Sequence, residues 1–342
     1  MKAIMMGDKN YDQGIPVIDV APYLNGDAKE KKEVASLVSS ACEQSGFFCI
    51  IGHGVDENLI ARTRQAGADF FSCTDEVKLK ALRSSDRTGC GYYPVADRAL
   101  AKTLGVETPP DLQEAWAMTR EDVPDEPYFK DGVGRFFFAP NKWPEDVPGF
   151  RKTLVEYFDT MSALGQKLMG LLALALKLDE DYFADKINKA TNQFRFIYYP
   201  PQKTSPDTHQ LRAGAHTDYG ALTILRGDDV PGTLQVKLPT VGWADVRPPK
   251  NAFVCNLGDA MAHWTGGRWA STLPRVANPS PNSATQEVLQ KGRMTLVFFH
   301  TPNHDVVLSG LADNEAEKRV ITVAEHYQQK IRSAVDTTPP AA

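Results

Sequence analysis

The chain has 342 residues, of which 42% are hydrophobic and 24% are charged, and its formal net charge is -5. This composition is typical of a globular protein with one large core or two closely packed halves. The negative charge and the lack of a long Lys/Arg run give no support for a nucleic-acid partner or for binding to a membrane surface.

The cysteines argue against a disulfide framework or a zinc knuckle, because they are odd in number, widely spaced and include no CxxC. We therefore expect reduced thiols and a cytoplasmic location. The apolar stretch at the N-terminus is too short for a signal peptide. The longest apolar stretch, Leu168–Leu176, has about nine residues against the roughly 20 that span a membrane, which predicts a buried helix.

The first 70 residues read as alternating strands and helices. Ile15–Asp19 is a short β-branched run, and apolar residues recur at helical spacing from about Lys31 to Gln44. Gly46 ends that helix. Phe47–Ile51 then predicts a buried strand, and Glu57–Phe71 a second amphipathic helix.

The centre of the chain predicts long loops and then a long helix. Residues 84–148 are rich in Gly, Pro and aromatic residues, which is typical of loops that lie over a binding site. A helix is expected from about Gly149 to Leu178, with one apolar stripe that belongs to the core.

The last third of the chain predicts many short strands, which favour a sandwich or jelly roll. The expected strands are Phe194–Tyr199, Leu222–Leu225, Leu234–Leu238, Phe253–Leu257, Trp269–Val276 and Met294–Phe299. A final helix is expected over Val323–Val335. The tail, residues 337–342, is expected to be disordered.

His216-Thr217-Asp218 is the sharpest chemical feature of the sequence. On a strand, residues i and i+2 point to the same side, so the imidazole and the carboxylate would project together. They would be two of the three ligands of a 2-His-1-carboxylate iron site. By itself this triplet is common, and without further context an exposed polar strand end is the better interpretation.

Two further features could bind an acid. Arg293 and Thr295 would share one strand face, where a guanidinium and a hydroxyl can hold a carboxylate. Tyr199 stands at the end of a predicted strand and could donate to the same ligand. Alone, each has a structural alternative, a surface arginine or a core aromatic residue.

Taken in order, these motifs make the chain resemble the iron(II)- and 2-oxoglutarate-dependent dioxygenases, in their isopenicillin-N-synthase-like branch. The resemblance covers nearly the whole chain. Its motifs are Ile15-Pro-Val-Ile-Asp19, Gly46-Phe-Phe-Cys-Ile-Ile-Gly-His-Gly-Val55, Leu104–Glu114, Phe138–Pro144, Tyr198-Tyr-Pro-Pro201, Ala215-His-Thr-Asp-Tyr-Gly-Ala-Leu-Thr223, Asn256-Leu-Gly-Asp259 and Arg293-Met-Thr295.

The resemblance implies a fold and a set of roles. The fold would be α+β, a double-stranded β-helix (jelly roll, cupin-like) flanked by N-terminal and central helices. His216 and Asp218 would bind Fe(II). Arg293 and Thr295 would bind the distal carboxylate of 2-oxoglutarate, and Tyr199 would assist there.

The implied reaction converts 2-oxoglutarate and O₂ to succinate and CO₂ while a small organic substrate is hydroxylated, desaturated or cyclised. The expected segments are an N-terminal dioxygenase region (14–125), a supporting helix (149–178), the β-helix domain (190–305) and a C-terminal helix (323–335). The oligomeric state is left open.

The sequence departs from this family at the second metal histidine. Ser271-Thr-Leu-Pro-Arg-Val276 carries Pro274 where relatives have histidine, and proline has no side chain that binds metal. If Gly266-Gly267 is a hairpin turn, His263 lies about 13 Å from that position, at roughly 3.3 Å per residue. His300 would face away from Arg293.

The remaining histidines, His53, His209, His304 and His326, are expected to be structural or exposed. A smaller departure is Ile197, which replaces an asparagine that often lies two positions before the residue corresponding to Tyr199.

Three functions stay open at this stage. The first is an active oxygenase whose iron is held by His216, Asp218, cosubstrate and water, or by a ligand that the sequence does not identify. The second is an impaired relative that only binds a small acid, and the third is an iron oxidase that does not use 2-oxoglutarate. We favour the first because the rest of the site is intact. Residues 84–120 should contribute to the substrate pocket, with Arg87, Tyr92 and Tyr93 as candidates.

Overall fold

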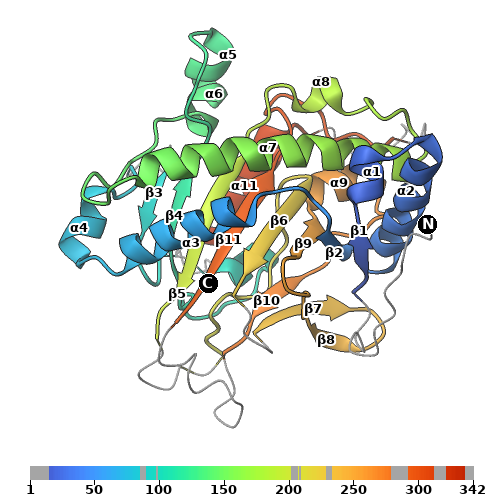
Figure 1. The fold of residues 1–342 in the computed structure, drawn as a ribbon. Coiled ribbons are helices and arrows are strands. Elements are labelled where there is room, and N and C mark those ends of the chain that lie inside the picture. The colour runs from blue at the N-terminus through green and yellow to red at the C-terminus, as the bar shows by residue number, and fades with distance from the viewer. Residues whose placement is uncertain are drawn as a thin grey trace.

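The computed structural model describes residues 15–84, 90–97, 99–201, 207, 209–228, 233–278, 292–311 and 321–335. The first half of the chain supplies four strands and most of the short helices (Figure 1). In chain order these are β1 (Val17–Asp19), α1 (Ala21–Asn25), α2 (Ala28–Gln44), β2 (Phe47–Ile51), α3 (Glu57–Phe71), α4 (Asp75–Lys80), β3 (Gly91–Tyr93), the 3-10 helix η1 (Leu100–Leu104), β4 (Glu114–Met118), α5 (Pro127–Lys130) and α6 (Gly132–Phe137).

The second half begins with the longest helix and then supplies most of the strands. Its elements are α7 (Phe150–Ala175), α8 (Ala184–Ile187), β5 (Gln193–Tyr199), β6 (Leu222–Gly227), β7 (Leu234–Leu238), β8 (Gly242–Asp245), β9 (Phe253–Leu257), α9 (Asp259–Trp264), β10 (Pro274–Val276), β11 (Arg293–His300) and α11 (Val323–Val335).

Two sheets form the centre of the molecule. The large sheet has eight strands in the order β1-β2-β9-β6-β11-β5-β4-β3, and the small sheet has three in the order β10-β7-β8. Apolar side chains of both sheets form one cluster, in which Val236 of β7 joins Val254 of β9 and Phe47 of β2. The sheets therefore pack face to face, which is the arrangement of a jelly roll. The predicted fold class is confirmed.

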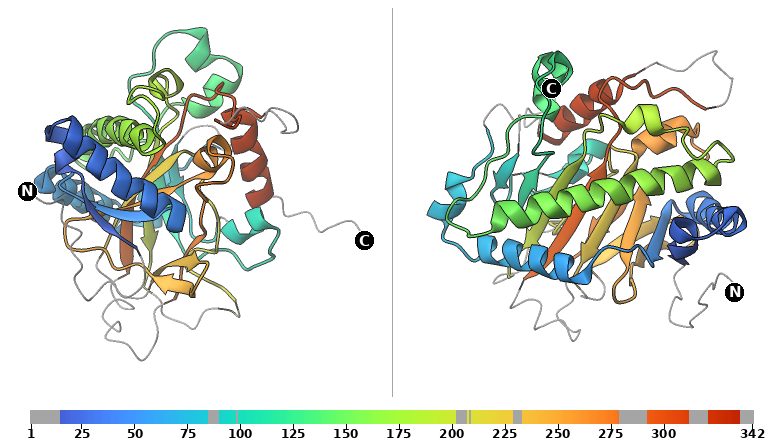
Figure 2. Two further views of the ribbon diagram at one scale, coloured as in Figure 1. Left: turned by 90° about the vertical axis from the view of Figure 1, so that its right-hand side faces the viewer. Right: turned by 45° about the horizontal axis from the view of Figure 1, so that its top comes forward.

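Helices cover the other face of the large sheet. Figure 2 shows α7 lying across the strands with α3 beside it, and α2 packs on α7 as well. The main core lies here and contains the stripe Leu154, Met161, Leu164 and Leu168 that the sequence indicated. The large sheet thus has a helix-covered side and an inner side that faces the small sheet.

Alternation along β5 decides which side chains reach that inner side. Phe194 and Phe196 are fully buried in the core under α7, whereas Arg195, Ile197 and Tyr199 point the other way. Because side chains alternate along a strand, one heptapeptide both anchors the helices and lines the interior of the jelly roll.

Most of the predicted elements are confirmed, with a few corrections at their ends. Helix α2 begins earlier than predicted, because Asp27 and Glu30 form a reciprocal capping box. The predicted strand Trp269–Val276 is wrong over its first five residues, since only Pro274–Val276 pairs with β7. The Gly266-Gly267 hairpin is also wrong, because helix α9 ends just before it. The tail, residues 337–342, lies outside the described residues.

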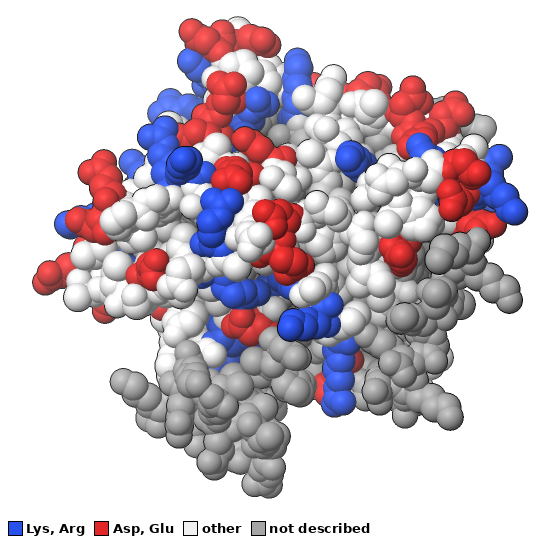
Figure 3. All heavy atoms as spheres, in the orientation of Figure 1, with Lys and Arg blue, Asp and Glu red and all other residues white. Residues whose placement is uncertain are grey.

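The surface charges and the helices can be described for the part of the chain that the structure covers. On the face shown in Figure 3, acidic and basic side chains are intermixed over the described residues and form no continuous basic surface. Among the described residues, no helix combines the length and apolar character that crossing a bilayer requires.

Candidate active site

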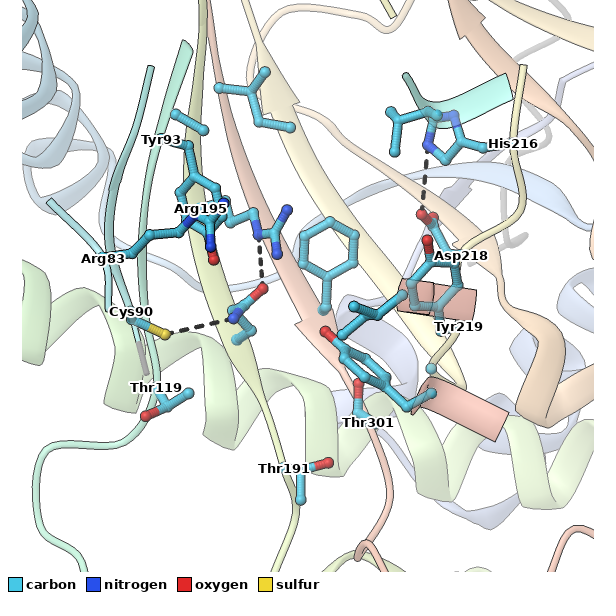
Figure 4. A pocket seen from close by; sticks show the side chains of 18 of the residues that line it. Arg83, Cys90, Tyr93, Thr119, Thr191, Arg195, His216, Asp218, Tyr219 and Thr301 are labelled. Carbon is cyan, nitrogen blue, oxygen red and sulfur yellow. Dashed lines mark hydrogen bonds and ion pairs between the residues drawn. The ribbon is translucent and has the colours of Figure 1, made fainter. Parts of the chain in front are cut away.

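Two adjoining cavities lie on the inner side of the large sheet. The outer cavity has a volume of about 150 Å³ and the inner cavity one of about 70 Å³. They share six lining residues, Leu100, Gln113, Ile197, His216, Asp218 and Phe299. His216 and Asp218 thus stand at the junction between the two cavities, and Figure 4 shows them together on one side of the outer one.

The segment that carries His216 and Asp218 is irregular, so the prediction that they lie on a regular strand is wrong. The ring nitrogen Nδ1 of His216 lies 2.8 Å from the carbonyl oxygen of Gly214. A carbonyl only accepts hydrogen bonds, so Nδ1 carries the proton and the lone pair of Nε2 is available to a metal. Nε2 is 3.8 Å from Oδ1 of Asp218.

Two donors hold the carboxylate of Asp218 in place. Thr223 Oγ1 donates to Oδ2 at 2.7 Å, and Asn256 Nδ2 donates to the same oxygen at 2.6 Å. Oδ1 remains directed toward His216. Ligand carboxylates of metal sites are oriented in this way by second partners.

The connection between β9 and α9 holds the segment that carries His216 and Asp218 in place. A Cβ on Gly258 would lie 2.2 Å from the carbonyl oxygen of Gly220, so only glycine allows this close approach. The backbone nitrogen of Asp259 donates to the carbonyl oxygen of Asp218 at 2.7 Å, and the hydroxyl of Thr217 donates to the side chain of Asp259. Burial alone would raise the pKa of Asp259, but the hydrogen bond from His326 and the charge of Lys330 outweigh it and lower that pKa to about 2.

Arg293, Thr295 and Tyr199 line the inner cavity but not the outer one. Arg293 pairs with Tyr199 across β11 and β5, and all three side chains are buried. Within the described structure, Nε and Nη1 of Arg293 and Oγ1 of Thr295 have no hydrogen-bond partner. Burial lowers the pKa of Arg293 and raises that of Tyr199. Because unpaired buried donors are costly, this group is suited to receive an anionic ligand such as a carboxylate.

Pro274 also faces the inner cavity, next to His216. Its carbonyl oxygen accepts a hydrogen bond from the backbone nitrogen of His216 at 3.3 Å, and its ring lines the cavity. Proline has no side-chain atom that binds metal, so residue 274 contributes no ligand to this junction. As it stands, no group of three or more His, Cys, Asp or Glu side chains that could hold a metal occurs in the described part of the chain.

The other histidines near the sheet have structural contacts. His263 is exposed on α9 with its ring against that of His326. His300 is fully buried on the opposite face of β11 from Arg293, as expected, and His304 stacks on Tyr128. His326 is buried and paired with Asp259. The cavities thus offer buried donors that suit a carboxylate and, at their junction, one imidazole nitrogen and one carboxylate oxygen of the types that bind metals.

The three candidate substrate residues have different positions. Tyr93 lines the outer cavity. Tyr92 points into the core and donates a hydrogen bond to Glu114, so its position does not support a role in the substrate pocket. Arg87 lies outside the described residues. The sequence analysis did not single out Arg195, which lines the outer cavity; the alternation of side chains along β5 was the only signal for it.

Comparison with known proteins identifies the family. The model of the 2OG-Fe(II) oxygenase superfamily matches residues 190–302, and that of the non-haem dioxygenase in morphine synthesis N-terminal region matches residues 15–146. A 2-oxoglutarate-Fe(II) type oxidoreductase from Emericella nidulans is 32% identical over 85% of this chain and 80% of its own length. A homoarginine-6-hydroxylase from Arabidopsis thaliana is 32% identical over 87% of this chain and 88% of its own.

Solved structures similar to this chain support the same family. A Neurospora crassa protein crystallised with alpha-KG and 5-formyluracil superposes with a TM-score of 0.77 at 28% identity, covering 94% of this chain and 97% of its own. A 2OG-Fe(II) oxygenase family protein from Caulobacter crescentus gives a TM-score of 0.78 at 26% identity, covering 93% and 98%.

The chain belongs to the 2-oxoglutarate- and iron(II)-dependent oxygenase superfamily. It is a dioxygenase of that class, with Fe(II) as its metal, 2-oxoglutarate as its cosubstrate and O₂ as the oxidant. These similarities favour this function over the two alternatives that the sequence left open.

Proposed function

We propose that 2-oxoglutarate occupies the inner cavity with its distal carboxylate on Arg293 and Thr295. The observation that carries this proposal is the set of buried donors without partners that line the inner cavity. Two parallel hydrogen bonds from a guanidinium match the geometry of a carboxylate. Tyr199, whose ring lies under the guanidinium at 5.3 Å, keeps the arginine in place.

The reactive end of the cosubstrate would then lie at the junction, beside His216 and Asp218. Both side chains are oriented by partners that leave one ligand atom of each available, Nε2 and Oδ1. Iron at this position supplies the activation of O₂ that the class uses. The substrate, a small molecule, would enter from the outer cavity and present its reacting carbon at the same junction.

Because Pro274 stands where relatives have the third protein ligand, 2-oxoglutarate would also help to hold the metal. Two protein ligands hold a metal more weakly than three, and a 2-oxo acid anchored at Arg293 brings additional oxygen ligands to the junction. We therefore expect metal and 2-oxoglutarate to strengthen each other's binding. Because binding free energies are linked, the factor by which each tightens the other must be equal.

Metal titrations under anaerobic conditions test this proposal. The full chain is titrated with Fe(II), and with Mn(II) followed by its EPR signal, in the presence and absence of 2-oxoglutarate. We expect the cosubstrate to tighten metal binding at least tenfold. Arg293→Met should remove the effect, whereas Arg247→Met, which changes an exposed arginine just after β8, should keep it.

The result can contradict the proposal in two ways. Equal metal affinity with and without 2-oxoglutarate would show that the cosubstrate does not help to hold the metal. Unchanged 2-oxoglutarate affinity in Arg293→Met, measured by calorimetry, would remove the assigned carboxylate site. Succinate formation in air then distinguishes an enzyme from a binding protein, and O₂ uptake without succinate would indicate an oxidase.

The same proposal includes a cytoplasmic location. Support comes from the cysteines, all of which lie in the described part of the chain and none of which is joined to another by a disulfide. Four of the five are buried, as is usual for thiols that pack as small apolar side chains.

A further inference from the structure

Arg195 is a cationic side chain in the outer cavity that neither the metal site nor the cosubstrate site uses. It lies on β5, four residues before Tyr199, and its side of the strand is the one that lines the cavities. Figure 4 shows its guanidinium projecting from the strand into the cavity, on the side opposite His216 and Asp218. A molecule between them would contact both.

The charge of Arg195 is not compensated by any carboxylate in the described part of the chain. Its Nε donates to Oε1 of Gln193 at 2.6 Å, which is a neutral acceptor. Its guanidinium lies over the rings of Tyr93 and Phe299, at 5.2 and 5.8 Å from their centroids. Its terminal nitrogens thus remain available to a ligand.

A second arginine of the same cavity, Arg83, differs from Arg195 because it is paired with a carboxylate. Arg83 also lies over the ring of Tyr93, at 4.8 Å, but it donates to both carboxylate oxygens of Asp97 at 3.0 Å. One cation of this cavity is therefore paired within the protein, while the other is oriented by an amide and by aromatic rings. An arginine placed in this way is complementary to an anion.

The other residues that line the outer cavity indicate the chemical character of the rest of that ligand. Much of the wall is aromatic, from Phe136 and Phe137 of α6, Phe299 of β11 and Tyr327 of α11. Such walls bind flat or apolar groups, and a volume of about 150 Å³ admits only a small molecule. A neutral apolar substrate would leave the guanidinium desolvated and unpaired, which costs free energy.

We propose that the substrate is a small carboxylic acid with an aromatic or apolar body, whose carboxylate binds Arg195 while its reacting carbon points toward His216 and Asp218. This inference rests on the proposed function and specifies its substrate class. Gln193 is a positioning residue, because its Oε1 fixes the direction of the guanidinium and its Nε2 contacts Cys90 Sγ at 3.5 Å.

Binding of matched acids and amides tests the proposal. The full chain, saturated with 2-oxoglutarate under anaerobic conditions, is titrated by calorimetry with a panel of arylalkanoic and alkanoic acids. Phenylacetate and indole-3-acetate are included, and each acid is paired with its amide. Because a hydrogen bond between a guanidinium and a carboxylate is stronger than one between a guanidinium and a neutral amide oxygen, we expect the best acids to bind at least about tenfold more tightly than their amides.

Two variants test whether Arg195 is the source of the preference for acids over amides. Arg195→Gln should abolish it, whereas Arg247→Gln, which removes an exposed arginine that lines neither cavity, should keep it. Retained preference in Arg195→Gln, equal affinity of acids and amides, or no binding of any acid in the panel at 10 mM would each overturn the inference. The affinity for 2-oxoglutarate is measured in the same samples, so that its loss in the parent chain identifies a failure of the proposed function instead.

Discussion

Pro274→His is the substitution that most directly tests the metal site. Residue 274 is the first of β10, an edge strand of the small sheet, so the backbone tolerates proline there and should accept histidine equally. Pro274 and Val276 both point inward, and the carbonyl oxygen of residue 274 contacts the backbone of His216. An imidazole on this Cα would therefore enter the inner cavity beside Nε2 of His216.

The expected gain follows from what such a ligand contributes. Removing partners that merely orient metal ligands lowers affinity by about 10- to 100-fold. A direct ligand should contribute more, so we expect metal affinity to rise by at least about 100-fold, which is about 2.7 kcal/mol. Dependence of metal binding on 2-oxoglutarate should fall at the same time, because three protein ligands hold the metal without it.

The measurement is a titration with Co(II), followed by its visible absorption, together with succinate formation in air. Pro274→Ala is the matched control, since it removes the proline without adding a ligand. Equal metal affinity of the histidine and alanine variants would refute the assignment of residue 274 to the metal site. Thermal unfolding of both variants checks that the comparison is between folded proteins.

Three further changes test other parts of the structure. Asn256→Ala removes one of the two donors to Asp218 and should lower metal affinity about 10- to 100-fold in the same titration, and an unchanged affinity would contradict that role. Gly227→Ala would place a Cβ 2.8 Å from Nη2 of Arg293, so calorimetry should show 2-oxoglutarate binding weakened by about tenfold or more. His300 is buried and its pKa is lowered to about 4, so the neutral form stabilises the fold above pH 6.5 and this stability is lost as the pH falls toward 4. The free energy of unfolding should fall by about 2 kcal/mol between pH 7.5 and pH 5, beyond any change in His300→Leu, and parallel pH profiles of the two proteins would refute this.

Local patterns in the sequence were sufficient for most of the framework. The β-branched and aromatic runs predicted β2, β5, β7, β9 and β11, because strands with one or two buried faces leave a regular apolar pattern. Helical spacing predicted α3 and α11 with their observed ends. The failures came where tertiary contacts replace local pairing. Residues 269–273 and the segment around His216 make few ladder bonds and are held by loops and side chains.

The sequence by itself determined the family, the order of the motifs and the residue types of the site, including the anomaly at Pro274. These depend only on which side chains are present and on their spacing. The tertiary structure decided how those side chains meet. It placed Pro274 against His216, assigned Asn256 and Thr223 to the carboxylate of Asp218, and oriented Arg195 in the outer cavity by the neutral amide of Gln193. Such contacts join residues far apart in the chain, so no local pattern encodes them, and only the packing of the two sheets brings them together.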